Sequence, residues 1–358
     1  MKWLTASAAG VCVVLSALQP ARAEEIPAEY RKVIDKGLEW VAKAQHRDGH
    51  WEANGGAYPT TMTGLGGMVL LMEGSTIRDG KYANNILRAT DWLMGCSQRT
   101  GLISPLANNG RGYIHDHGYA LLFLACVYGE EEDGDRRRRL EGILTRAVLF
   151  TGKAQTKRGG WGYTSAAEGG DFDEGSTTIT QLQAVRACRN AGIAVPKQII
   201  ERAQKYLKDA TTARGGIMYS LAQGGSEGGP ALVAAAIAGG FSSGEYNSPL
   251  VKKWLTYART AIPIAQAGRF GHDEYTHYYY AQALYVLGDE GYAKLFPDSR
   301  DSDRVTWSKY RKVVFPYLAK SQNSDGSWNS GNIGAIYTTT CNLTILQLDN
   351  GTLPIYQR

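Results

Sequence analysis

The sequence predicts an all-α protein made of six helical hairpins arranged in two layers. Three observations indicate this fold class: a repeat of about 55 residues, an alternation of half-polar and fully apolar helices, and a globular composition. Of the 358 residues, 43% are hydrophobic and 20% are charged, which excludes a disordered chain and an integral membrane protein. The 39 Lys and Arg against 34 Asp and Glu give a net charge of +5. This surplus is too small to indicate a nucleic-acid partner.

The N-terminus has the pattern of a secretory signal peptide. A basic start and an apolar run at 6–18 precede the tripeptide Ala21-Arg22-Ala23, which suits cleavage before Glu24. The run is shorter than the ~20 residues that a transmembrane helix needs. We therefore expect an exported protein, periplasmic or extracellular, with signal peptide 1–23, one domain at 24–358 and no transmembrane anchor after cleavage.

The repeat carries a Gln-x-x-x-Gly-x-Trp motif. Its three complete copies are Gln45/Gly49/Trp51, Gln155/Gly159/Trp161 and Gln322/Gly326/Trp328. Degenerate copies begin at Gln98 and at Gln266 (before Phe270-Gly271), and the successive Gln separations are 53, 57, 111 and 56 residues. Because 111 is about two periods, a sixth copy is expected near Thr211, where Gly215 keeps the glycine turn.

Each unit pairs two kinds of helix. In the first unit, the segment from Tyr30 to Val41 has one apolar stripe, whereas 62–72 is apolar or glycine nearly all round. The segments 119–127 and 231–238 repeat the apolar pattern. A helix without a polar face must be covered on both sides, so these helices should form an inner layer. The third inner segment, 176–190, is an exception, because it carries Gln181, Gln183, Arg186 and Arg189.

The motif copies and the count of six units resemble the squalene cyclase and protein prenyltransferase β-subunit superfamily. That resemblance implies an (α/α)6 toroid with a central cavity, and the motif tryptophans are interpreted as plugs between units. The chain is most similar to an exported prenyltransferase-like subgroup. The segments that carry this second resemblance are 171–177, 277–282 and 353–358.

Polar residues concentrate between each outer helix and the next inner one, and a toroid would gather them at one end, here called the mouth. All six histidines lie there: His46, His50, His115, His117, His272 and His277. The candidate ligand-binding residues are His115, Asp116, His117, His272, Asp273, Glu274, His277, Tyr278 and Tyr337. A structural alternative stays open, because carboxylates also cap helix N-termini and complement the helix dipole.

The candidate catalytic residues are Asp171, Asp173 and Glu174. They resemble the Asp-x-Asp-Asp motif of class II terpenoid cyclases, in which the middle Asp protonates an alkene or epoxide. Asp173 matches that acid, and Glu174 replaces the last Asp. Crowded carboxylates raise one another's pKa, which keeps one of them protonated. The following Gly175-Ser176-Thr177 fits a helix cap better than a cyclase acid.

No metal and no cofactor are predicted. The Asp-x-Cys spacing of the prenyltransferase zinc site is absent, and the histidine pairs 115/117 and 272/277 do not align on one helical face. The cysteines of the mature chain are interpreted as isolated thiols, with disulfides left open; they are Cys96, Cys126, Cys188 and Cys341.

Two functions remain open. One is a cavity enzyme that acts on an apolar, isoprenoid-type ligand by proton-initiated chemistry at Asp173. The other is a non-catalytic module that binds a lipid, glycan or protein outside the cytoplasm. A deep aromatic pocket ending at Asp173 would favour the enzyme. A plugged centre, with carboxylates bonded to backbone N–H groups, would favour the binding module.

Overall fold

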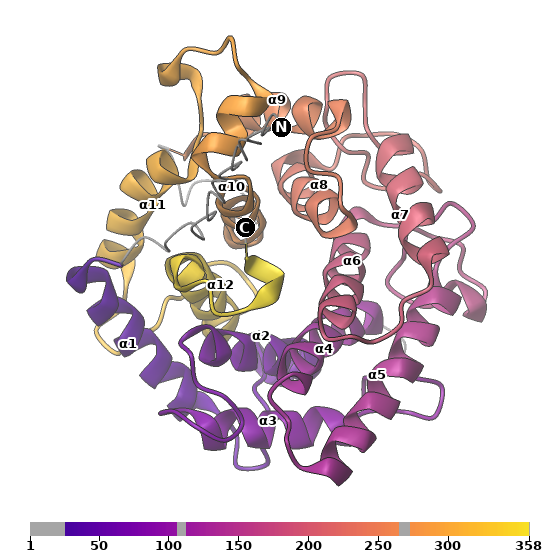
Figure 1. Cartoon of the computed structure of the whole chain (residues 1–358), viewed down its shortest axis with the longest axis vertical. Coiled ribbons are helices and arrows are strands. Elements are labelled where there is room, and N and C mark those ends of the chain that lie inside the picture. Colours follow the sequence, from indigo (N-terminus) through magenta and orange to yellow (C-terminus); the bar gives the residue numbers. More distant parts are fainter. Residues whose placement is uncertain (1–25, 106–111, 265–272, 358) are drawn as a thin grey trace, which may run out of the picture.

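The computed structural model describes residues 26–105, 112–264 and 273–357, which form two concentric layers of helices (Figure 1). The inner helices are α2 (Pro59–Met72), α4 (Tyr113–Tyr128), α6 (Gly175–Asn190), α8 (Gly229–Ser243), α10 (Asp273–Leu295) and α12 (Ala335–Gln347). The outer helices are α1 (Ala28–Ala44), α3 (Ala83–Gly95), α5 (Gly134–Ala154), α7 (Lys197–Asp209), α9 (Pro249–Ala261) and α11 (Trp307–Ser321). The predicted (α/α)6 toroid is confirmed.

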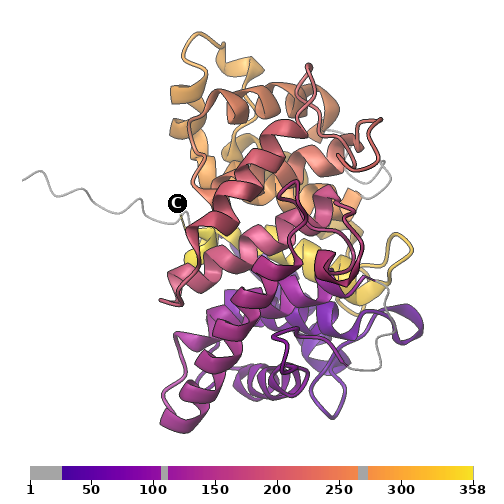
Figure 2. The same ribbon diagram turned by 90° about the vertical axis from the view of Figure 1, so that its right-hand side faces the viewer.

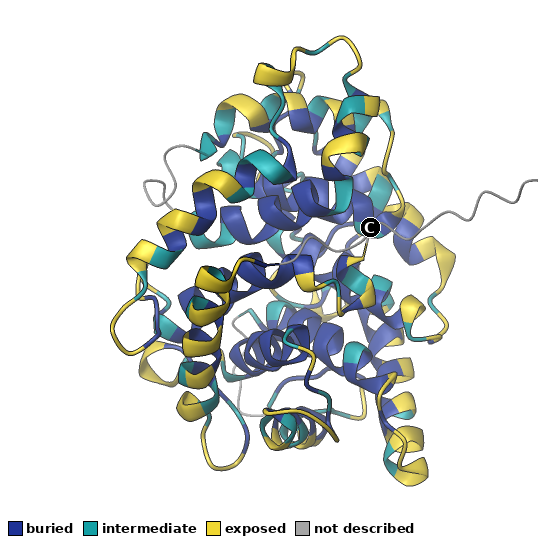
Figure 3. Cartoon of the chain, turned by 60° about the vertical axis from the view of Figure 1, so that its left-hand side comes forward, coloured by how far each residue is buried: buried dark blue, intermediate teal, exposed yellow. Residues whose placement is uncertain are grey.

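The two layers differ in burial as their sequences predict (Figure 3). Nearly every residue of α2 is buried, whereas α7 buries only the stripe Ile199, Ile200, Ala203, Tyr206 and Leu207. The exceptional helix α6 still belongs to the inner layer, and the amide nitrogens of Gln181 and Gln183 are hydrogen-bonded there. The Gln181 amide donates to the Ile114 carbonyl at 2.8 Å, and the Gln183 amide donates to the Gln282 side chain at 2.7 Å. Buried polar groups of this kind are tolerated only when hydrogen-bonded.

Each residue of the repeated motif has a structural role, shown by the third unit. Gly159 has φ +98°, and a Cβ there would lie 2.1 Å from the Arg202 carbonyl oxygen on α7. The Gln155 amide donates to the carbonyls of Gly159 (2.7 Å) and Ile199 (3.0 Å). The Trp161 indole donates to the carbonyl of Thr151 at 2.8 Å. The motif therefore joins each repeat to the outer helix of the next.

The same contacts close the ring. In the sixth repeat the Gln322 amide donates to the Val33 carbonyl of α1 at 2.9 Å, and α12 packs against α2. The expected turn near Thr211 is also present, since the Thr212 N–H donates to the Gly216 carbonyl at 2.9 Å and Gly215 has φ +100°. The degenerate copy at Gln266, with Phe270 and Gly271, lies outside the described residues.

The chain ends at the side of the toroid where the inner helices finish. After α12, two short 3-10 turns, Leu348–Asn350 and Pro354–Tyr356, lead to the C-terminus, and the second contacts α6 and α10. In the side view this end lies on the left (Figure 2). We call it the plugged end, defined by residues 351–357 and the last turns of α6, α8 and α10.

The described part of the chain holds no helix that is both long and apolar enough to cross a membrane. The predicted signal peptide at 1–23 lies outside the described residues, so it stays a prediction. The four cysteines after it are free thiols, two of them buried; they are Cys96, Cys126, Cys188 and Cys341.

Candidate functional site

The three candidate catalytic carboxylates lie just before α6 but have different surroundings. Asp171 is half-exposed and stabilises the motif turn of the third repeat. Its Oδ1 accepts from the Lys157 N–H at 2.8 Å, and its Oδ2 lies 3.1 Å from the Arg158 guanidinium. These contacts are those of a turn-stabilising side chain.

Asp173 is fully buried and points away from the toroid axis, toward the fourth repeat. Its Oδ1 accepts from four donors, which are Leu221 N (2.6 Å), Ser220 Oγ (3.2 Å), Ala222 N (3.3 Å) and Tyr206 OH (3.3 Å). Its Oδ2 lies 3.5 Å from the Arg158 guanidinium. The contacts are those expected from the structural alternative, so an acid role for Asp173 stays a prediction that its surroundings do not favour.

Glu174 is the N-cap of α6, and only 1% of it is exposed. Its Oε2 accepts from the Thr177 N–H at 3.1 Å and from the Ser176 hydroxyl. Burial raises the pKa of Glu174, the nearby Asp173 carboxylate adds to the increase, and the hydrogen bonds from Ser176 and Thr177 oppose it. The surroundings of Glu174 therefore favour its protonated form.

Polar and aromatic side chains surround Glu174 at the mouth. The Ser176 hydroxyl lies 3.2 Å from His115 Nε2, so α4 and α6 meet there. Burial lowers the pKa of His115 to about 4, which keeps its ring neutral at ordinary pH. The half-exposed rings of Tyr163 and Tyr219 join through their hydroxyls. The pKa of Tyr163 is raised mainly by burial and secondly by the charge of Glu174.

Two of the other candidates in the second repeat are structural. Asp116 is buried and accepts from the Thr61 N–H at 3.1 Å and from its hydroxyl at 2.7 Å, which caps the first turn of α2. His117 Nδ1 accepts from the Ile103 N–H at 3.1 Å, and its Nε2 lies 2.9 Å from the Thr151 hydroxyl. Burial lowers the pKa of His117 to about 3. Both residues hold neighbouring elements together.

The candidates in the fifth and sixth repeats make separate contacts. His277 Nδ1 lies 2.8 Å from the Tyr310 hydroxyl, and its Nε2 lies 3.4 Å from Asp273 Oδ1. Glu274 Oε1 accepts from the Ser330 hydroxyl at 2.5 Å. Tyr337 is buried in the inner layer, and burial raises its pKa well above the usual value. His272 lies outside the described residues.

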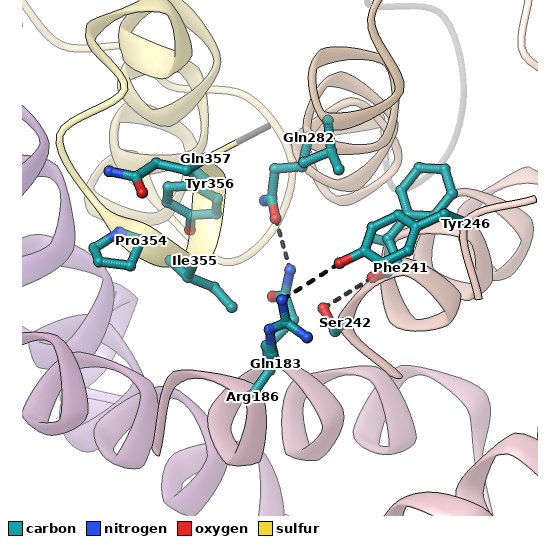
Figure 4. Close-up of a pocket in the computed structure, with 12 residues that line it drawn as sticks. Gln183, Arg186, Phe241, Ser242, Tyr246, Gln282, Pro354, Ile355, Tyr356 and Gln357 are labelled. Atoms are coloured by element: carbon teal, nitrogen blue, oxygen red, sulfur yellow. Dashed lines mark hydrogen bonds between the residues drawn. The ribbon is translucent and has the colours of Figure 1, made fainter. Parts of the chain in front are cut away.

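The axis is filled by side chains toward the plugged end. The hydroxyls of Tyr119 and Tyr279 lie 3.1 Å apart, and those of Tyr278 and Tyr356 lie 3.5 Å apart. Beyond them is a cavity of about 30 Å³, bounded by the Gln183–Gln282 pair and by Ile355 and Tyr356 (Figure 4). Sites for drug-sized ligands usually measure about 300–1,000 Å³. This cavity has room for about two water molecules and not for an isoprenoid, so the expected central binding cavity is not found at this end of the described residues.

Sequence reasoning missed the tyrosine pair at the mouth. Tyr163 and Tyr219 are 56 residues apart, one repeat period, and each lies four residues after the glycine of its turn. That equivalence was a usable signal, because side chains at matching positions of adjacent repeats lie on the same end of a toroid. Ser176 was recognised as part of a helix cap, but its contact with His115 depends on how two repeats pack.

The fold is an (α/α)6 toroid whose polar side chains gather at the mouth. No family model matches the chain. It is 28% identical over 291 residues to a probable squalene–hopene cyclase of Sinorhizobium fredii (strain NBRC 101917 / NGR234), which covers 75% of this chain and 43% of that protein. It is 33% identical over 128 residues to lanosterol synthase of Homo sapiens, which covers 32% of this chain and 17% of that protein. The chain thus spans less than half the length of these curated relatives.

Solved structures share the fold over nearly the whole chain. A type II terpene cyclase from Scytonema superposes with a TM-score of 0.59 at 14% identity, covering 91% of this chain and 99% of that chain. An α-1,6-mannanase from Salegentibacter sp. HEL1_6 superposes with a TM-score of 0.60 at 10% identity, covering 89% and 98%. At these identities the structural matches show the fold alone. The two sequence matches agree with the resemblance to the squalene cyclase superfamily that the motif repeats indicate.

Proposed function

We propose that this protein is an exported, terpenoid-cyclase-like toroid that binds an apolar, isoprenoid-type ligand at the mouth and protonates it with Glu174. The observation that carries the proposal is the buried Glu174 carboxyl, whose pKa is raised. Its neighbours include the half-exposed Tyr163 ring and the neutral His115 ring. The Scytonema terpene cyclase has the same fold, and one of its structures contains geranylgeranyl dihydroxybenzoate, named as its substrate. That structure superposes on this chain with a TM-score of 0.56.

The proposed step assigns the acid to Glu174 rather than Asp173. The Glu174 carboxyl gives its proton to one carbon of an alkene, which leaves a carboxylate and a carbocation on the other carbon. The aromatic face of Tyr163 stabilises that cation by cation–π attraction. The cation then loses a neighbouring proton or captures water, and the proton released restores Glu174. Because the axis is filled, we expect isomerisation or hydration rather than a cascade that forms several rings.

A second candidate function is the non-catalytic module that binds a lipid, glycan or protein outside the cytoplasm. The filled axis favours it, since the cavity there measures about 30 Å³. The capping contacts of Asp173 with the Leu221 and Ala222 N–H groups favour it as well. In this function the tyrosines at the mouth provide contact area, and Glu174 only caps α6.

Solvent deuterium separates the two functions. The mature protein is incubated in D₂O with an unsaturated C20 isoprenoid alcohol, and deuterium bound to carbon is measured by mass spectrometry. We expect the wild type to incorporate deuterium and Glu174→Gln to lose about 100-fold or more of that rate. The control Asp171→Asn should retain it. Equal labelling by Glu174→Gln would remove Glu174 as the acid, and ligand binding without any labelling in the wild type would favour the binding module.

Export is a separate part of the proposal and has its own test. Intact-mass measurement of the protein from the envelope fraction of its own cells should give a chain that begins at Glu24. A chain in the cytosolic fraction that retains Met1 would contradict export.

A further inference from the structure

The motif turn of the first repeat brings two imidazoles and a carboxylate together at the mouth. The rings of His46 and His50 stack with centroids 4.3 Å apart. Glu52 lies between their Nε2 atoms, with Oε1 3.7 Å from His46 and Oε2 3.4 Å from His50. One nitrogen or oxygen from each of the three residues lies within 4.8 Å of the others. The stacked Trp92 ring, 5.1 Å from His50, supports the arrangement from α3.

The turn itself does not require these residues, as the other repeats demonstrate. In the first repeat the His46 N–H donates to the His50 carbonyl at 2.9 Å. The same bond at 2.9 Å joins Thr156 to Gly160 in the third repeat and Asn323 to Ser327 in the sixth. In the sixth repeat the Asn323 and Ser327 side chains also touch, at 3.1 Å. The fold therefore places these two side chains side by side, and in the first repeat both are imidazoles.

Asp48 fixes the orientation of the His50 ring. Its Oδ1 lies 2.6 Å from His50 Nδ1. In the sixth repeat, Asp325 holds the position of Asp48, and it accepts from the Ser327 N–H at 2.9 Å and from the Ser327 hydroxyl at 2.7 Å. With the Nδ1 proton donated to Asp48, the lone pair of Nε2 faces the Glu52 carboxylate. Two acceptors in that position repel each other unless a proton or a cation lies between them. A carboxylate on the outer nitrogen of a metal-binding histidine is a common supporting contact.

We propose that His46, His50 and Glu52 form a divalent transition-metal site of the zinc class. Nitrogen and carboxylate ligands suit Zn²⁺, which is typically bound in a tetrahedron. Ligand atoms of such a tetrahedron lie about 3.3–3.5 Å apart, so the His46 ring must turn out of its stack on His50 to direct its Nε2 atom at the same ion. His46 and Glu52 are partly exposed, which leaves them room to move. Three protein ligands leave one position for water or another small ligand.

An adjoining cavity gives that fourth position access to solvent. It measures about 330 Å³ and lies between the first and sixth repeats. His46 and Glu52 form part of its wall, together with Trp40 and with Ala335 and Ile336 at the start of α12. A small oxygen-bearing ligand that reaches the metal through this cavity would also contact the start of the inner helix α12. The site is independent of the acid chemistry proposed for Glu174.

The test is metal binding by the whole mature chain, made without a histidine tag. Co²⁺ is titrated in, its visible absorption reports four-coordinate binding, and Zn²⁺ is then added as a competitor. We expect one ion per chain, displaced by Zn²⁺. The variant with His46→Asn and His50→Ser should lose binding by about 100-fold or more, since it lacks two of the three ligands. It should fold normally, because the sixth repeat forms the same turn with those residues.

Two further variants sharpen the result. Asp48→Asn removes only the group that orients His50, so binding should weaken by about 10–100-fold rather than vanish. His115→Asn removes a different histidine at the mouth and should leave the cobalt spectrum unchanged. Equal binding by the variant with His46→Asn and His50→Ser, or no ion bound by the wild type, would overturn the proposal.

Discussion

The two ends of the toroid are built from the same helices but differ in chemistry. The mouth, where the inner helices begin, holds Glu174, His115 and Asp116, with half-exposed tyrosines above them. At the plugged end, Ile355 and Tyr356 cover the inner helices and leave a cavity of about 30 Å³. Helix N-termini leave backbone N–H donors without partners and therefore attract acceptor side chains. The polarity of the inner helices thus collects carboxylates at the mouth whether or not they do chemistry.

The adjacent residues Asp173 and Glu174 show how to separate those two roles. Both are buried. Asp173 Oδ1 accepts from four donors and has a guanidinium near its other oxygen, whereas Glu174 accepts from two donors, and burial dominates its pKa. Burial with few donors favours the protonated form of a carboxyl, as at Glu174. Position in a motif therefore says less about acid strength than the number of donors that the fold directs at each oxygen.

The largest effect is expected for the turns that build the mouth. Gly159→Ala adds a Cβ 2.1 Å from the Arg202 carbonyl oxygen at φ +98°. The left-handed conformation costs about 1–2 kcal/mol, and the clash adds about 1–3 kcal/mol more. Denaturant unfolding should show a loss of about 2–5 kcal/mol. The control Gly169→Ala, with φ +103° and open space around its Cβ, should lose only about 1–2 kcal/mol. Similar losses in both variants would mean that the close approach of α7 carries no cost.

At the plugged end, Tyr356→Ala should lower the free energy of unfolding by about 3 kcal/mol, because it removes a buried aromatic ring from the axis. Tyr356→Phe keeps the ring and loses only a 3.5 Å contact with the Tyr278 hydroxyl, so its loss should be below about 1 kcal/mol. Thermal unfolding measures both. If Tyr356→Ala is as stable as the wild type, the segment does not plug the axis.

At the mouth, His117 should make stability fall in acid. Burial lowers its folded pKa to about 3. The unfolded chain therefore binds the proton first as the pH falls below about 6.5. Between pH 8 and pH 5 this loss amounts to about 2 kcal/mol, and it continues toward pH 3. His117→Gln, which cannot gain that proton, should show a shallower decline than the wild type. Parallel declines in urea titrations would contradict a buried neutral His117.

Glu174 should give the opposite and smallest pH dependence. Its folded pKa is raised above the ordinary value of 4.5, so its contribution to stability is full below that value and is lost as the pH rises through the folded pKa. Glu174→Gln keeps an oxygen for the Thr177 N–H and should cost less than about 1 kcal/mol at low pH. As the pH rises, the free energy of unfolding of Glu174→Gln should increase relative to that of the wild type. Urea titrations at several pH values measure this difference. A difference that does not change with pH would show that the pKa of Glu174 is the same in the folded and unfolded chains.

Much of the fold followed from local sequence rules. The motif glycines and glutamines placed the turns, and helices without a polar face placed the inner layer. The missing copy near Thr211 was found at Gly215 because the turn needs glycine, not tryptophan. Ring closure followed only from the family resemblance, since the Gln322–Val33 contact joins residues 289 positions apart.

The candidate site was less predictable because its chemistry depends on packing. The sequence placed Asp173 and Glu174 together but not their donors; three of the four donors to Asp173 come from a turn 47–49 residues later. His117 looked like a possible ligand, yet Ile103 and Thr151 engage both ring nitrogens. The histidine pairs 115/117 and 272/277 were the ones weighed as metal ligands from the sequence, whereas the stacking of His46 on His50 depends on the conformation of a turn.

Photoaffinity labelling with a diazirine-bearing isoprenoid alcohol, followed by peptide mapping, most directly tests whether the mouth is the functional end. The account predicts labels near Glu174, on Tyr163, on Tyr219 or on Phe172, whose ring lies 5.8 Å from that of Tyr163. Unlabelled isoprenoid alcohol should compete these labels away. Labels confined to Ile355, Tyr356 or Phe241, which line the small cavity, would place the ligand at the plugged end and contradict the account.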